Sequence, residues 1–192
     1  MNKYLPEEVR NSNTQVTILI SVLFLYFLGK MIFLALNIGT NISPDEITWI
    51  GLSHVFSKTF FLPTNTPESY QFGLITHVPY LYPWLMGKVL HLNFFNISDL
   101  VFLRLVNVCI GMSTLWLGWK SISLLTQSTI TRVLFIVLCT NTLMLTFLNS
   151  FVSYDNLVNF LAAAALYFLI AFLKSAPFPF CCSVRYSFSQ VV

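Results

Sequence analysis

The sequence predicts an all-α, polytopic helical membrane protein, and three observations predict it. Hydrophobic residues make up 56 % of the 192 residues and charged residues only 9 %, against roughly 25 % charged residues in soluble domains. The mean hydropathy is +0.75. Several stretches approach the roughly 20 apolar residues that cross a bilayer as a helix. A soluble domain of this size cannot hide so much apolar surface from water.

About four transmembrane helices are expected, and nothing resembles the alternating strands of a membrane barrel. Lys30 falls inside the first span, where an ammonium is costly unless it snorkels or faces the protein interior. The predicted spans cover residues 16–38, 100–119, 133–152 and 157–173.

A long polar and aromatic loop, residues 39–99, separates the first two spans. Its own apolar stretch, 78–92, is short and broken by two prolines, so we expect an interfacial or re-entrant helix rather than a span. Tyr80, Tyr82 and Trp84 would then lie at headgroup level.

The charges predict a cytoplasmic N-terminus. This orientation places most Lys and Arg residues in short cytoplasmic segments, as the positive-inside rule requires. Those cations are Lys3, Arg10, Lys120, Arg132, Lys174 and Arg185. Five of the seven acidic residues then lie outside, namely Asp45, Glu46, Glu68, Asp99 and Asp155.

The predicted organisation has three parts. Residues 1–15 form a cytoplasmic N-terminus, 16–174 the transmembrane region with its outer loop, and 175–192 an irregular tail. The net charge of +3 is small and scattered, which gives no sign of a nucleic-acid partner. The four Cys residues lack the spacing of a zinc or redox site.

The segment 43–46 (Ser-Pro-Asp-Glu) has two interpretations. Ser43 as N-cap with Glu46 three residues later fits a capping box, which would start an amphipathic helix over residues 45–58. Its apolar face would comprise Trp49, Ile50, Leu52 and Phe56. Asp45 is not needed for the box and is therefore a candidate functional carboxylate at the membrane surface.

Three further positions carry candidate chemistry. His77 precedes the proline-broken aromatic stretch and is either an interfacial histidine or an anion or proton site. Arg104, near the start of the second span, would pair with Asp99, snorkel to headgroups or clamp a phosphate. Asp155 precedes the fourth span and is either a helix cap or a second outer carboxylate.

The order of these features resembles the GT-C superfamily of membrane glycosyltransferases, in particular the aminoarabinose-transferase and protein-mannosyltransferase type. The resemblance covers about residues 16–174. Its motifs are Pro-Asp-Glu at 44–46, His-Val-Pro-Tyr-Leu-Tyr at 77–82, Arg-Leu-Val-Asn at 104–107 and Asp-Asn-Leu at 155–157. Position 78 is Val where the family motif has Pro, and family members have more spans, so we expect the chain to correspond to the N-terminal portion of such an enzyme.

The resemblance implies transfer of a sugar from a polyprenyl-phosphate donor to a hydroxyl at the outer face. Asp45 would be the catalytic base. Glu46, His77, Tyr80, Arg104 and Asp155 would bind substrate, with His77 and Arg104 stabilising the leaving phosphate. Asp45 and Asp155 are also the candidate ligands of a divalent metal.

A non-catalytic polytopic membrane protein is the alternative, such as a transporter fragment, an assembly subunit or a degenerate glycosyltransferase remnant. Transporters place polar residues in broken helices near the midplane of the bilayer. Lys30 and Asn141 are the main residues here that qualify.

Overall fold

The described part of the chain is helical and contains no strand. A computed structural model describes residues 7–40, 42–43, 45–61, 67–70, 79–94 and 97–175. Its helices are α1 (Glu7–Asn37), α2 (Glu46–Ser57), α3 (Pro67–Tyr70), α4 (Leu81–Leu90), α5 (Asp99–Leu125), α6 (Thr129–Asn141), α7 (Leu143–Asn149) and α8 (Tyr154–Ser175).

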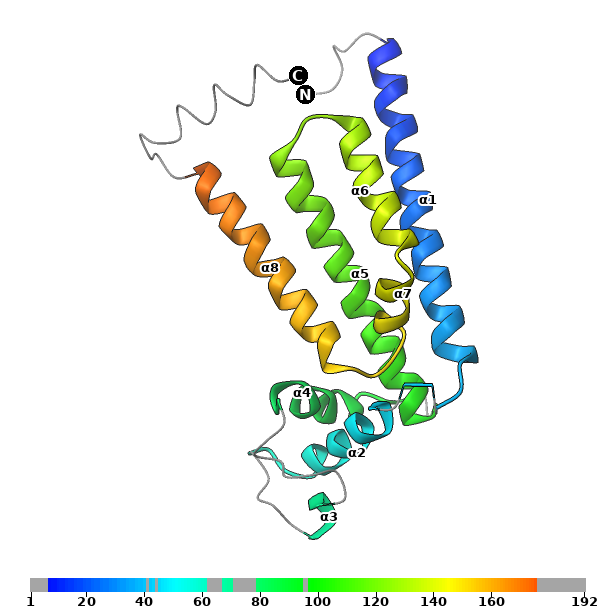
Figure 1. The fold of residues 1–192 in the computed structure, drawn as a ribbon, viewed down its shortest axis with the longest axis vertical. Helices are drawn as coiled ribbons and strands as arrows, with labels where there is room; N and C mark the ends of the chain where they lie inside the picture. The colour runs from blue at the N-terminus through cyan, green and yellow to red at the C-terminus, as the bar shows by residue number, and fades with distance from the viewer. Residues whose placement is uncertain are drawn as a thin grey trace.

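The helices form two parts (Figure 1). The long helices α1, α5 and α8 run alongside the pair α6–α7, with α1 and α6–α7 antiparallel to α5 and α8. The short helices α2, α3 and α4 lie across one end of this bundle, which we call the acidic end because Asp45, Glu46, Asp99 and Asp155 lie at helix starts there.

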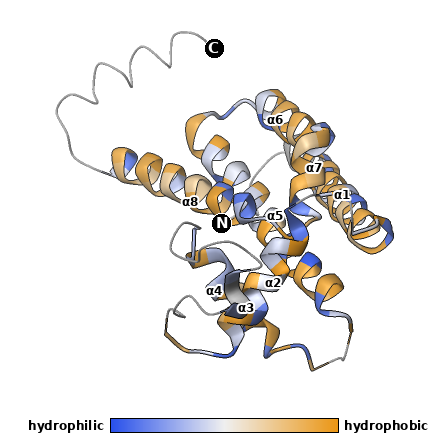
Figure 2. Ribbon diagram, turned by 60° about the horizontal axis from the view of Figure 1, so that its bottom comes forward, coloured by the Kyte–Doolittle hydropathy of each residue, from blue (hydrophilic) through white to orange (hydrophobic). Residues whose placement is uncertain are grey.

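Within the described residues, three helices are long and apolar enough to cross a membrane. They are Thr14–Asn37 of α1, Asp99–Leu125 and Tyr154–Ser175. The pair α6–α7 passes the same test as a unit but bends by 62° at its break, so the described part of the chain has three candidate spans, or four if the pair counts as one. Figure 2 shows apolar residues along α1, α6, α7 and α8, and a mixture of apolar and polar residues along α2 and α4.

The break in α6–α7 was not expected from the sequence, which predicted one continuous span over 133–152. Three consecutive polar side chains bond back to the carbonyls of their own helix: Thr140 to Ile136, Asn141 to Val137 and Thr142 to Leu138, at 2.9, 2.9 and 2.7 Å. Such back-bonding offers the backbone an alternative to the helical ladder and bends helices.

Lys30 on α1 lies at this break. Its Nζ donates to the Thr140 carbonyl at 3.0 Å and lies 5.1 Å from the centroid of the Tyr26 ring. A cation suits the carbonyl end of a helix. Lys30 therefore faces the protein interior, the second of the two arrangements expected for it.

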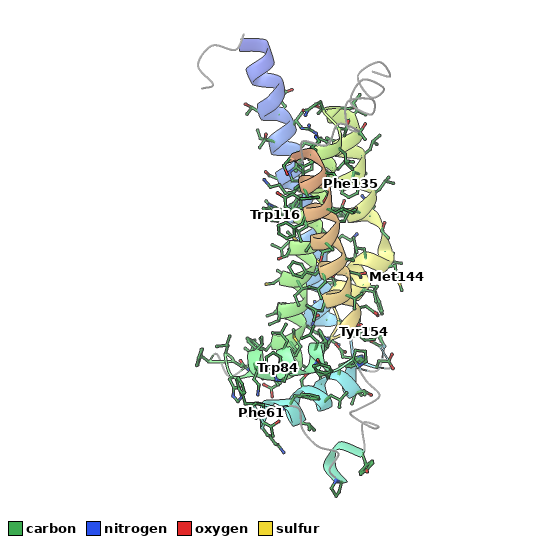
Figure 3. All side chains as sticks on the ribbon, turned by 90° about the vertical axis from the view of Figure 1, so that its left-hand side faces the viewer. Phe61, Trp84, Trp116, Phe135, Met144 and Tyr154 are labelled. Carbon is green, nitrogen blue, oxygen red and sulfur yellow. The ribbon has the colours of Figure 1, made fainter. Side chains whose placement is uncertain are left out.

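Helix α4 does not span, as expected, because its ten residues extend only about 15 Å. It packs along α2, and its side chains satisfy the last carbonyls of α2. Lys88 donates to Phe56 at 3.0 Å, and His91 Nε2 lies 3.1 Å from the Ser57 carbonyl. In Figure 3, Trp84 lies in this terminal layer and Tyr154 lies where the layer meets the bundle.

Two apolar clusters hold the parts together. One joins α1, α5 and α6 inside the bundle through Phe27, Met31, Ala35, Val108, Leu115 and Ile136. The other joins α2 and α4 to the acidic end of the bundle through Trp49, Leu52, Phe56, Tyr82, Met86, Leu103, Val152 and Leu157. The second cluster contains three of the four residues predicted for the apolar face of α2, and Ile50 packs against it.

Candidate functional site at the acidic end

A buried ion pair forms the base of the candidate site. Arg104 Nε donates to Glu46 Oε1 at 2.8 Å, and Arg104 Nη2 donates to Glu46 Oε2 at 2.6 Å. Glu46 is 0 % and Arg104 2 % exposed. Two parallel bonds between a planar guanidinium and a carboxylate are the strongest arrangement that such a pair adopts.

This pair connects four segments of the chain. Arg104 Nη1 donates to the carbonyls of Ala35 and Ile38, at 3.0 and 2.7 Å, and so satisfies the C-terminal end of α1. Glu46 Oε1 accepts a bond from the Val152 backbone at 3.0 Å. Helix α1, helix α2, helix α5 and the α7–α8 connection are therefore held at one point.

For each of these residues, one of the alternatives that the sequence left open is wrong. Glu46 is not the third residue of a capping box, because α2 begins at Glu46, Asp45 is its N-cap, and the Glu46 carboxylate is occupied by Arg104. Arg104 does not pair with Asp99. The side chains of Glu46 and Arg104 are bonded to each other, and a direct contact of either one with a substrate remains a prediction.

Asp45 occupies an exposed position directly beside the buried pair. Its backbone carbonyl starts the helix by accepting from Trp49 at 3.0 Å, and its carboxylate makes no capping bond. The exposed carboxylate is therefore not used to cap the helix, and it belongs to the residue next to one that is fixed in the interior.

Asp155 lies in the adjoining segment. Its Oδ2 accepts from the Ser153 hydroxyl at 3.1 Å, and the same hydroxyl accepts from the Asp155 backbone at 3.2 Å. The ring centroids of Trp49 and Tyr154 are 5.0 Å apart, and Glu46 bonds Val152. The start of α2 and the start of α8 are thus neighbours, as required if Asp45 and Asp155 belong to one site.

The aromatic motif divides between surface and interior. Tyr80 is half-exposed at the N-cap of α4, whereas His77 lies outside the described residues. Tyr82 points into the protein, where its hydroxyl and the Asn107 side chain are 2.8–3.1 Å apart, and Asn156 donates to Asn107 at 3.0 Å.

Tyr82 is held neutral by its surroundings. Burial raises the pKa of Tyr82 far above its ordinary value; the hydrogen bond with Asn107 lowers it in part, and the nearby Glu46 charge raises it again. Asn156 also donates to the carbonyls of Leu148 and Phe151, at 2.8 and 3.0 Å, and so satisfies the end of α7.

The sequence interpretation missed a second acid–base pair. His54 Nε2 on α2 lies 3.4 Å from Asp99 Oδ2, and both side chains are about half-exposed. Asn93 also donates to Asp99, at 3.0 Å. The sequence gives no sign of this contact, because His54 and Asp99 are 45 positions apart and form no local pattern.

No group of three or more His, Cys, Asp or Glu side chains suited to a metal occurs within the described residues. A metal held by Asp45 and Asp155 alone remains a prediction. Comparison with protein-family models, with curated proteins and with solved structures finds no match to this chain.

Proposed function

We propose that this chain is an integral membrane protein that transfers a sugar from a polyprenyl-phosphate donor to an acceptor hydroxyl at the outer membrane face. The observation that carries the proposal is the position of Asp45. It is exposed, its carboxylate makes no capping bond, and it directly precedes Glu46 of the buried Glu46–Arg104 pair. A base must be held in position while remaining accessible to its substrate.

In this mechanism Asp45 accepts the proton of the acceptor hydroxyl while that oxygen attacks the anomeric carbon. The bond from that carbon to the phosphate oxygen breaks, and the polyprenyl phosphate leaves. Direct displacement needs a single base. Glu46 and Arg104 act as positioning residues, because their side chains are hydrogen-bonded to each other in the interior.

The anionic leaving group needs a positive or hydrogen-bonding partner near Asp45. Helices α2, α5 and α8 all start at the acidic end, and each start already carries a carboxylate, so that partner has to come from another segment. In this proposal Tyr80 and Asp155 orient the sugar or the acceptor, and His77 is the predicted partner of the phosphate.

The test is sugar transfer in proteoliposomes supplied with polyprenyl-phosphate sugars. Asp45→Asn should reduce transfer at least about 10²-fold, since a general base contributes typically 10²–10⁴-fold. Asp99→Asn is the matched control, because it removes another carboxylate of the acidic end that has no role in the mechanism. Full transfer by Asp45→Asn would remove Asp45 from the mechanism.

A transport function is the second candidate, and the broken α6–α7 pair favours it. Discontinuous membrane helices with a polar group at the break form the substrate sites of many transporters. Here Lys30 bonds the last turn of α6, next to Asn141. The proteoliposome assay separates the two functions. If the chain is a transporter, the wild type shows no sugar transfer. If it is a glycosyltransferase, both the wild type and Lys30→Met transfer sugar.

A further inference from the structure

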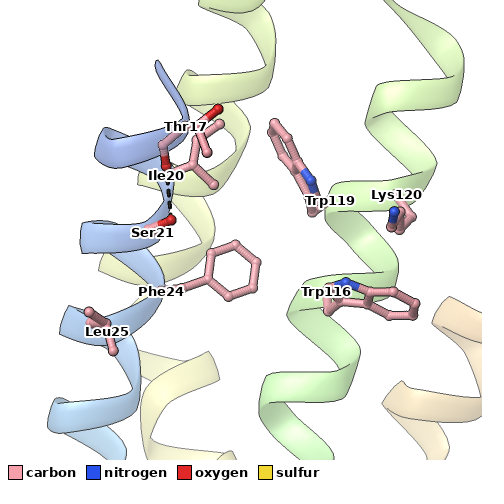
Figure 4. Close-up of a pocket in the computed structure, with 8 residues that line it drawn as sticks. All are labelled: Thr17, Ile20, Ser21, Phe24, Leu25, Trp116, Trp119 and Lys120. Carbon is pink, nitrogen blue, oxygen red and sulfur yellow. Dashed lines mark hydrogen bonds between the residues drawn. The ribbon is translucent and has the colours of Figure 1, made fainter. Parts of the chain in front are cut away.

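A groove lies between α1 and α5 at the end of the bundle opposite the acidic end (Figure 4). Its volume is about 650 Å³. Helix α6 packs against both α1 and α5 and lies behind the groove in this view. The sugar-transfer proposal does not use this groove.

The lining of the groove changes in character along its length. Thr17 and Ser21 supply hydroxyl-bearing side chains near the start of the apolar segment of α1. Phe24 and Leu25 lie deeper along the same helix. From Thr17 to Leu25 the helix advances about 12 Å, a distance over which a membrane changes from headgroups to acyl chains.

The α5 side supplies the groups that bind at a membrane surface. Trp116 and Trp119 line the groove with Lys120. The Trp119 ring lies between the two helices in Figure 4. Tryptophan is the side chain most suited to headgroup level, where its ring is apolar and its N–H is polar.

Lys120 gives the groove its charge. Its Nζ lies 5.4 Å from the centroid of the Trp116 ring, it is exposed, and no described carboxylate pairs with it. None of the described residues that line the groove is acidic. Arg132 and Lys174 lie at the same end of the bundle, as does the start of α1 with Glu7 and Glu8, so the positive charge of the groove itself comes from Lys120.

We propose that this groove binds a phospholipid with a net negative charge, its phosphate near Lys120 and an acyl chain against Phe24 and Leu25. Basic pockets between membrane helices on the cytoplasmic side bind anionic headgroups. The proposal rests on membrane insertion with a cytoplasmic N-terminus, as proposed above, and is independent of sugar transfer.

The native tryptophans supply the test. The full chain carrying Trp49→Phe and Trp84→Phe retains Trp116 and Trp119 as its fluorophores. It is reconstituted into phosphatidylcholine vesicles that contain the same mole fraction of brominated phosphatidylglycerol or brominated phosphatidylcholine. Bromine quenches tryptophan emission on contact, so quenching reports which lipid occupies the groove.

Phosphatidylglycerol should occupy the groove about fivefold more strongly than phosphatidylcholine, which corresponds to the roughly 1 kcal/mol that one lysine contributes. Lys120→Gln should abolish this preference. Lys174→Gln is the matched control and should keep it, because Lys174 lies at the same end on α8, outside the groove.

Three results would overturn the proposal. Equal quenching by the two lipids in the parent protein would show that the groove does not distinguish charge. Loss of preference in both lysine variants would show general surface attraction. Weak quenching by either lipid would show that a second copy of the chain or another helix fills the groove. Circular dichroism of each variant checks that it is folded.

Discussion

At the scale of single residues, the acidic end depends on one buried ion pair. Removing a guanidinium and a carboxylate from water costs several kcal/mol per ion, which their attraction offsets only when the geometry is good and the remaining atoms are bonded. Here Arg104 gives bonds to Glu46, Ala35 and Ile38, and Glu46 accepts one more from Val152. The pair is therefore sensitive to the loss of either member.

Arg104→Met should lower the free energy of unfolding by about 3–5 kcal/mol, because it leaves the Glu46 carboxylate buried without its partner. The double variant with Glu46→Met should be more stable than Arg104→Met alone, since no charge is then left unpaired. Denaturation in mixed micelles measures both. Asp99→Asn, in the half-exposed pair with His54, should cost at most about 1 kcal/mol; a similar cost for Arg104→Met would contradict the role of the buried pair.

Tyr82 should make the protein sensitive to alkali. Its folded-state pKa lies far above the unfolded value of about 10, so above that pH the unfolded chain loses a proton that the folded chain keeps. The contribution of Tyr82 to the free energy of unfolding is therefore complete below pH 10 and falls above that pH, by about 1.4 kcal/mol per pH unit. Tyr82→Phe should remove this contribution from a pH series of unfolding measurements, whereas Tyr80→Phe, at a half-exposed site, should keep it.

At this end the sequence predicted the start of a helix at Asp45 and Glu46 but not the partner of the Glu46 side chain. Glu46 was assigned to a local cap because the capping box is a pattern of four neighbouring residues, visible in sequence. Its actual partner lies 58 positions away, and pairing inside a low-dielectric interior outweighs a cap, which contributes about 1 kcal/mol. Asp45, in contrast, lies at the exposed start of the helix, as expected.

At the scale of elements, composition predicted the long helices, but it did not predict that polar side chains break one of the predicted spans into α6 and α7. The apolar lengths of α1, α5 and α8 agree with the predicted spans because burial in lipid requires only length and hydropathy. The break between α6 and α7 depends on side-chain bonds by Thr140, Asn141 and Thr142, which hydropathy does not register. Hydropathy treats these residues as a minor interruption of a span.

The contact of α2 with α4 requires a glycine at position 87. A Cβ added there would lie 2.6 Å from the Ser53 carbonyl oxygen and 2.8 Å from the Ser57 nitrogen, both backbone atoms that cannot rotate away. Gly87→Ala should separate the helices and cost about 1–3 kcal/mol. The loss should appear in unfolding and as faster amide exchange in α2.

Gly29→Ala is the control for this substitution. No atom lies within 4 Å of a Cβ added at position 29, so the change should be neutral or stabilise α1 by up to about 1 kcal/mol through helix propensity. If both alanines had the same effect, the close approach of α2 and α4 would not be the reason for a glycine at position 87.

At the scale of the whole molecule, most acidic residues of the described helices lie at one end of the bundle. Asp45, Glu46, Asp99 and Asp155 lie there together with the cations Lys58, Lys88 and Arg104. Lys120, Arg132 and Lys174 lie at the other end, with the start of α1, which carries Glu7 and Glu8. The sequence predicted this separation because each charge flanks an apolar span and neighbouring spans alternate in direction. The layer formed by α2 and α4 could not be predicted in the same way, since it depends on contacts between residues far apart in the chain.

The charge distribution leads to a prediction about orientation in the membrane. Cations are retained on the cytoplasmic side, so the acidic end should face outward and the connection between α5 and α6 inward. In a variant with all four Cys replaced by Ser, Phe61→Cys and Gln127→Cys each place one exposed thiol, at the acidic and the opposite end respectively. A membrane-impermeant maleimide added to intact cells should label the first and reach the second only after the membrane is opened. The reverse pattern would place Asp45 in the cytoplasm, where an outer-face sugar transfer could not use it, and labelling of both in intact cells would mean that α5 does not span.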